Sequence, residues 1–155
     1  MKKLLAGLML ATALVAPGIA EAATVTITAN LVRYSGPAAY LAVYLTNPDG
    51  SYNSTLWVAG QKTKYYGSLR GWASSASQGG SLSLDGITGA SVGSGGTLTV
   101  TADLADTLLD AGYKIHVDTA VEHGGEYADD AVIDLTSAPA SVAGSGYVDS
   151  LSVGN

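Results

Sequence analysis

The sequence contains no cysteine among its 155 residues. Disulfides, thiolate metal sites, iron–sulfur clusters and c-type haem attachment are therefore excluded. If the protein carries electrons, an organic cofactor is the simplest carrier. Positive charge is also scarce, with 7 Lys and Arg against 13 Asp and Glu.

Residues 1–22 have the pattern of a secretory signal peptide. Lys2 and Lys3 precede the apolar run 4–16, and the segment 20–22 supplies small residues for cleavage before Ala23. The run is too short to span a bilayer, and no later segment approaches that length. We therefore expect a periplasmic or secreted protein whose mature chain does not insert into the membrane.

The mature chain is expected to be residues 23–155, a single domain of 133 residues after removal of the 22-residue leader. Without Lys2, Lys3 and Glu21, 5 cations remain of the 7 and 12 anions of the 13. So acidic a surface argues against nucleic acid and anionic lipid as partners.

Apolar and polar residues alternate through most of the mature chain. This alternation predicts strands at 24–31, 97–102, 113–122, 131–135 and 146–153. The segment 40–46 is apolar on both faces and should be a central strand, followed by a turn at 47–50 and a returning strand at 56–59. About seven short strands predict an all-β fold, an immunoglobulin-like β-sandwich.

The segment 62–75 departs from this pattern. Tyr65, Leu69 and Trp72 recur at the spacing of one helical face, which predicts one short helix, followed by a loop from 74 to 83. In the strand 113–122, His116 lies on a polar face beside Lys114 and should be solvated.

Residues 85–91, Asp-Gly-Ile-Thr-Gly-Ala-Ser, form the most informative stretch of the chain. Gly89 and Ala90 leave room for a bulky group near the backbone, and Gly89 tolerates dihedral angles that other residues resist. The hydroxyl of Ser91 is then a candidate attachment point for a group delivered by another protein. The same residues also fit an ordinary Asp-Gly turn in a Gly/Ser loop.

This stretch resembles the acceptor motif of ApbE-type flavin transferases, Asp-x-x-(Ser/Thr)-Gly-Ala-(Ser/Thr). The match involves five residues: Asp85, Thr88, Gly89, Ala90 and Ser91. The resemblance implies that the transferase splits FAD and leaves FMN on the Ser91 hydroxyl as a phosphoester. It also implies that Asp85 is read by the transferase or fixes the turn.

Most of the mature chain resembles a family of predicted periplasmic proteins found alongside PepSY-domain membrane proteins and ApbE transferases. The resemblance follows the segments 40–50, 56–57, 62–72, 85–91 and 112–125 in order. It implies an exported flavoprotein that relays electrons, with a PepSY-type membrane reductase as its possible donor.

Other residues are candidates for contacts with the flavin. The rings of Trp72, Tyr65 and Tyr66 would stack on it, or else form the core face of the short helix, which we favour for Trp72 and Tyr65. Three cations would hold the phosphate or ribityl end, or else lie on a solvated helix face: Lys62, Lys64 and Arg70.

His123, in a turn beside two glycines, is either a donor to the flavin ring or a surface histidine. The acids around it are either an ordinary acidic surface, which we favour, or a site for a hard cation: Glu122, Glu126, Asp129 and Asp130.

The sequence lacks the Gly-x-Ser-x-Gly elbow, the phosphate-binding Walker loop and the His-Glu-x-x-His zinc motif. We therefore expect an electron carrier with covalent FMN, no catalytic residues of its own and no metal site. The alternative is a cofactor-free adhesion or carbohydrate-binding sandwich, in which exposed Tyr and Trp stack on sugars.

Overall fold

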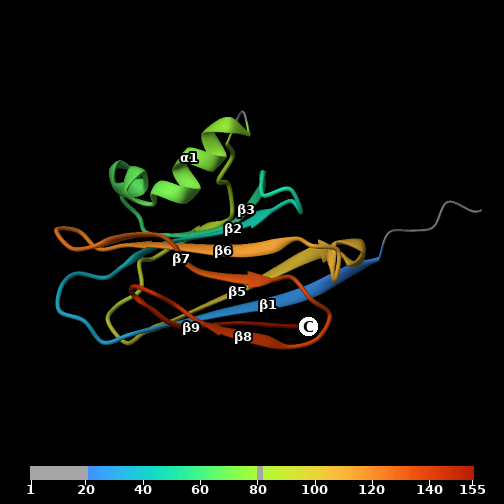
Figure 1. Cartoon of the computed structure of the whole chain (residues 1–155). Helices are drawn as coiled ribbons and strands as arrows, with labels where there is room; N and C mark the ends of the chain where they lie inside the picture. The colour runs from blue at the N-terminus through green and yellow to red at the C-terminus, as the bar shows by residue number, and fades with distance from the viewer. Residues whose placement is uncertain (1–20, 80–81) are drawn as a thin grey trace, which may run out of the picture.

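The computed structural model describes residues 21–79 and 82–155. Two β-sheets pack face to face, and one helix lies on the outside of the larger sheet (Figure 1). The smaller sheet has the order β5-β1-β9-β8, with strands Thr97–Ala105, Ala22–Leu31, Val148–Gly154 and Ala140–Ala143. The larger sheet has the order β4-β3-β2-β6-β7, with strands Thr88–Gly89, Tyr52–Ala59, Tyr40–Thr46, Lys114–Ala120 and Glu126–Asp134. The predicted all-β sandwich with one short helix is confirmed.

The alternating residues of the strands build the core between the sheets. In β1, Val25, Ile27 and Ala29 are buried, and the antiparallel register places Ile27 opposite Val100 of β5. Strand β2 lies between β3 and β6, and all seven of its residues are buried, so its predicted central position is confirmed.

The predicted helix is divided into two pieces. A 3₁₀ helix, η1, covers Thr63–Ser68, and an α-helix, α1, covers Arg70–Gln78. The interruption falls at Leu69, whose ψ of 71° is not helical. The prediction of a loop from residue 74 was therefore wrong for residues 74–78, because the small residues there continue α1.

Helix α1 forms a third layer over the larger sheet (Figure 1). It buries a second apolar cluster against the outward faces of β2 and β3, with Leu69 and Trp72 packed on Tyr40, Ala42 and Tyr44. A second 3₁₀ turn, η2, occupies Asp106–Leu108 in the excursion after β5. Two short strands, β4 and β8, were not predicted.

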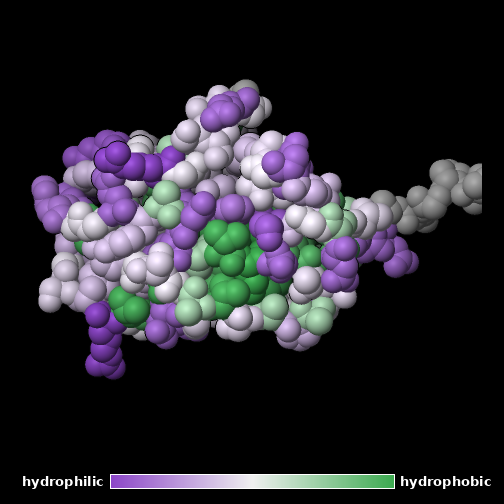
Figure 2. Space-filling view, viewed as in Figure 1, coloured by the Kyte–Doolittle hydropathy of each residue, from purple (hydrophilic) through white to green (hydrophobic). Residues whose placement is uncertain are grey.

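Figure 2 shows hydrophilic to intermediate residues over most of the surface on this side, with a large hydrophobic patch between the two sheets and a smaller one at the lower left. Of the predicted signal peptide, residues 1–20 lie outside the described residues, and β1 begins at Ala22. In the part of the chain that the structure describes, no helix is long and apolar enough to cross a membrane.

Candidate functional site

The motif at 85–91 enters the larger sheet as an edge strand. A tight turn precedes it, in which the Ile87 amide donates to Leu84 O at 3.2 Å and Gly86 has φ +75°. Strand β4 then runs parallel to β3, where Val58 N donates to Ile87 O and Gly60 N donates to Gly89 O. The Asp-Gly turn is therefore present, and it delivers the motif to the sheet.

Gly89 is required for close packing. A Cβ atom at this position would lie 2.7 Å from Cζ2 of Trp57, so only glycine lets β4 approach the indole ring. The φ angle of Gly89 is not positive, so the expected conformational reason was wrong. The Trp57 Nε1 hydrogen is a buried donor for which the described residues provide no acceptor.

Ser91 is held between two backbone anchors. On one side Gly89 is bonded to Gly60 at 2.8 Å, and on the other Val92 exchanges two hydrogen bonds with Ala39, at 2.6 and 2.9 Å. The Ser91 side chain is half-buried. Within residues 21–79 and 82–155 no hydrogen-bonding partner is found for its hydroxyl.

A hollow of about 460 Å³ lies beside the motif, and we call it the acceptor hollow. Asp85, Thr88 and Gly89 line it from the motif. The end of β3 and the start of η1 supply the facing residues: Gly60, Gln61, Thr63 and Tyr66. Asp85 is exposed, at the turn before β4.

His123 belongs to a second hollow, of about 200 Å³, which we call the histidine hollow. His123 has φ +59°, and its side chain is 89% exposed. The wall includes Tyr65, whose hydroxyl donates to Glu122, and Glu122 lies 3.6 Å from His123 Nε2. The Tyr65 hydrogen bond, aided by the charge of Lys62, holds the pKa of Glu122 below its usual range.

The predicted cations lie near the histidine hollow. The Nζ atoms of Lys62 and Lys64 lie 5.9 and 4.8 Å from the centre of the Tyr65 ring. Arg70 forms an ion pair with Glu126, which lines the same hollow, and this contact lowers the Glu126 pKa. Tyr65 and His123 thus line the histidine hollow and not the acceptor hollow, and Lys62 and Arg70 contact Tyr65 and Glu126 on its wall.

Trp72 is a core residue. It is 2% exposed, and its indole Nε1 donates to Thr55 Oγ1 at 2.8 Å. Trp72 could have stacked on a flavin or packed in the core, and its position is that of a packed core residue. Tyr65 is half-buried and packs against the same apolar cluster, and its ring meets Tyr40 edge-on with a centroid distance of 5.6 Å.

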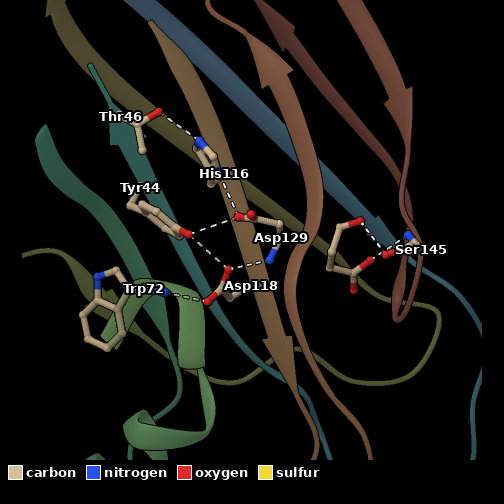
Figure 3. Close-up of polar contacts among 8 residues, drawn as sticks. Tyr44, Thr46, Trp72, His116, Asp118, Asp129 and Ser145 are labelled. Atoms are coloured by element: carbon tan, nitrogen blue, oxygen red, sulfur yellow. Dashed lines mark hydrogen bonds and ion pairs between the residues drawn. The ribbon is translucent and has the colours of Figure 1, made fainter. Parts of the chain in front are cut away.

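A polar network beneath α1 escaped sequence reasoning. Asp118 is fully buried and accepts hydrogen bonds from the amides of Trp72, at 2.7 Å, and Asp129, at 2.9 Å, and from the Tyr44 hydroxyl (Figure 3). Burial raises the pKa of Asp118, and burial with two nearby carboxylates raises that of Tyr44. This network ties the first turn of α1 to β6.

His116 is part of the same network. Its Nδ1 donates to Asp129 Oδ1 at 2.8 Å, its Nε2 is bonded to Thr46 Oγ1 at 2.9 Å, and its ring stacks on Tyr44 (Figure 3). Its side chain is only 15% exposed, so the prediction of a solvated histidine was wrong. The reason is that the side chains of Tyr44, Thr46 and Asp129 enclose its ring.

The four acids near His123 do not converge. Asp130 is only 2% exposed, so the favoured prediction of an acidic surface was wrong for this residue. Its carboxylate accepts hydrogen bonds from Thr119 and from the amides of residues 145–148. Asp129 pairs with His116, while Glu122 and Glu126 pair with Tyr65 and Arg70. Over the described ranges no group of three or more His, Cys, Asp or Glu side chains is arranged to hold a metal ion.

Residues 22–150 match a protein-family model described as "Predicted periplasmic protein (DUF2271)". No curated protein and no solved structure matches the chain.

Proposed function

We propose that the chain, which belongs to the DUF2271 family of predicted periplasmic proteins, is a periplasmic electron-transfer flavoprotein carrying FMN on Ser91 of the motif at 85–91. The periplasmic location expected from the leader is confirmed by this membership. In the proposal, an ApbE-type transferase attaches the flavin and a PepSY-type membrane reductase supplies electrons. The protein passes them to an extracytoplasmic acceptor.

The placement of Ser91 carries the proposal. Its hydroxyl has no partner among the residues described, and the anchors at Gly89 and Val92 hold it in one position. Gly89 and Ala90 add little bulk before it, and the acceptor hollow opens beside Gly89. The unpaired Trp57 N–H is a further polar group next to the motif. These residues fit a covalently held flavin phosphate.

The attachment balances as a transfer of the FMN unit from FAD. The Ser91 Oγ forms a bond to the flavin-side phosphorus, the bond from that phosphorus to AMP breaks, and the hydroxyl proton leaves with AMP. Once bound, FMN supplies reversible electron transfer. The protein retains the cofactor outside the cytoplasm through the ester, and Asp85 at the rim of the hollow disfavours additional negative charge there.

Intact mass tests this proposal. Coexpressed with an ApbE-type transferase, the mature protein should gain FMN less water, about 440 Da, and become yellow. Ser91→Ala should gain no mass and stay colourless. Ser74→Ala, which removes an exposed hydroxyl on α1, should be modified like wild type. An unmodified wild-type protein, or a modified Ser91→Ala, would refute the proposal.

The cofactor-free carbohydrate-binding alternative has one supporting observation. Tyr127 is 39% exposed and its ring meets Tyr147 at a centroid distance of 5.3 Å, which in turn packs on Tyr34. An exposed tyrosine fixed by its neighbours is a suitable surface for a sugar ring. Native protein without flavin absorbance, together with glycan binding that Tyr127→Ala abolishes, would favour this function.

A further inference from the structure

We propose that the isoalloxazine ring of the attached flavin binds in the acceptor hollow, stacked on Tyr66, and not in the histidine hollow. This inference rests on the proposed function, because it assigns the resting place of the cofactor that Ser91 would carry. It gives roles to Tyr66, Gln61 and Thr63 and leaves His123 out of contact with the ring.

Size and position favour the acceptor hollow. Pockets for small molecules and cofactors usually measure roughly 300–1,000 Å³. The acceptor hollow, about 460 Å³, lies within this range, and the histidine hollow, about 200 Å³, lies below it. Gly89 lines the acceptor hollow and is two residues from Ser91, which places their Cα atoms at most about 7 Å apart. No motif residue lines the histidine hollow.

Tyr66 is held ready for stacking. Its hydroxyl donates to Gly60 O at 2.8 Å, and its ring meets Trp72 and Tyr40 edge-on, at centroid distances of 5.8 and 6.5 Å. The residue is half-buried and lines the hollow. These contacts fix the ring without a flavin, so stacking costs little additional ordering.

Gly60 makes this arrangement possible. Its φ is +135°, and a Cβ atom there would lie 2.0 Å from Cδ1 of Tyr40. No residue with a side chain can therefore replace it without displacing Tyr40. The backbone that follows β3 can therefore pack directly against Tyr40.

The hollow also offers polar groups for the pyrimidine edge of the flavin. The side chains of Gln61 and Thr63 are exposed on its wall, and among the described residues neither makes a side-chain hydrogen bond. An amide and a hydroxyl both donate and accept, as the carbonyl and N–H groups of that edge require. Asp85 is the charged residue among those lining the hollow, so negative charge on the reduced ring is disfavoured there and the reduction potential is lowered.

Flavin fluorescence in the FMN-loaded protein distinguishes the two hollows, because a stacked tyrosine quenches isoalloxazine emission. Intact mass first establishes loading of each variant, so a failure of the proposed function is recognised as an absent mass gain. Tyr66→Leu should increase the emission severalfold, whereas Tyr65→Leu and His123→Ala, which alter the histidine hollow, should leave it unchanged. An increase with Tyr65→Leu or His123→Ala, or no increase with any variant, would overturn the inference.

A second pair of variants avoids the packing of Tyr66. Gln61→Ala should shift the visible flavin bands and the midpoint potential, because it removes a hydrogen-bonding group from the wall without touching the core. Gln78→Ala, an equally exposed glutamine at the end of α1, should change neither. Identical spectra and potentials for Gln61→Ala and wild type would place the ring outside the acceptor hollow.

Discussion

Asp118 should contribute strongly to the free energy of unfolding, because it attaches the first turn of α1 to β6. Asp118→Ala leaves the buried amide of Trp72 and the partly buried amide of Asp129 without an acceptor, while the Tyr44 hydroxyl keeps its bond to Asp129 at 3.2 Å. Each unsatisfied buried donor costs about 1–3 kcal/mol. Removing a desolvated carboxylate offsets part of this cost. We expect the free energy of unfolding to fall by about 2–4 kcal/mol at pH 7.

The pH dependence gives a sharper test. Because the pKa of Asp118 is raised above its ordinary 3.8 in the folded protein, the folded state binds a proton at a higher pH than the unfolded chain. The contribution of this group to stability therefore grows as pH falls from the raised pKa towards 3.8. Asp118→Asn cannot titrate, so wild type should gain stability relative to this variant over that interval.

Urea unfolding followed by tryptophan fluorescence, at pH 7 and at several values down to 4, measures both effects. Trp72 lies beside the substituted residue, so it contributes a signal from α1 to the emission, to which Trp57 of β3 also contributes. A loss below 0.5 kcal/mol for Asp118→Ala would contradict the assigned role. Parallel pH profiles for wild type and Asp118→Asn would contradict the titration argument.

Two further substitutions test the fold around the site. Asp130→Ala should lower the free energy of unfolding by about 3–5 kcal/mol in chemical denaturation, because the Thr119 hydroxyl and the amides of residues 145–148 lose their acceptor; a near-neutral effect would be inconsistent with this network. Gly89→Ala should cost about 1–3 kcal/mol and slow flavin attachment, because the new Cβ meets the Trp57 ring; wild-type stability with wild-type modification would show that β4 moves freely.

Alternation of apolar residues was sufficient to predict the main strands. The two apolar faces of 40–46 correctly indicated a central strand, because a strand whose outward face carries Tyr40, Ala42 and Tyr44 needs a covering layer. The same argument did not identify α1 as the cover over β6. The alternation in the sequence shows only that Asp118 and His116 are polar. A polar side chain that is buried with hydrogen-bonding partners gives the same alternation as a polar side chain in solvent.

The sequence was sufficient to identify the motif at 85–91, but not to predict which other residues lie next to it. The sequence marks residues 85–91, and the structure adds the packing of Gly89 on Trp57, which are 32 positions apart in the chain. The cations at 62, 64 and 70 are close to the motif in sequence. They face the histidine hollow because η1 and the break at Leu69 turn them towards Glu122 and Glu126. Such long-range placement does not follow from local spacing.

The carboxylate of Asp130 joins the two halves of the sandwich. It belongs to β7 of the larger sheet, and the amides it binds lead into β9 of the smaller one. Apolar contacts between sheets are non-directional, and by themselves they allow one sheet to slide or rotate over the other. A group of directional bonds at one point acts against that shear. The start of β9 is thereby held at one position along β7, whatever apolar side chains fill the core.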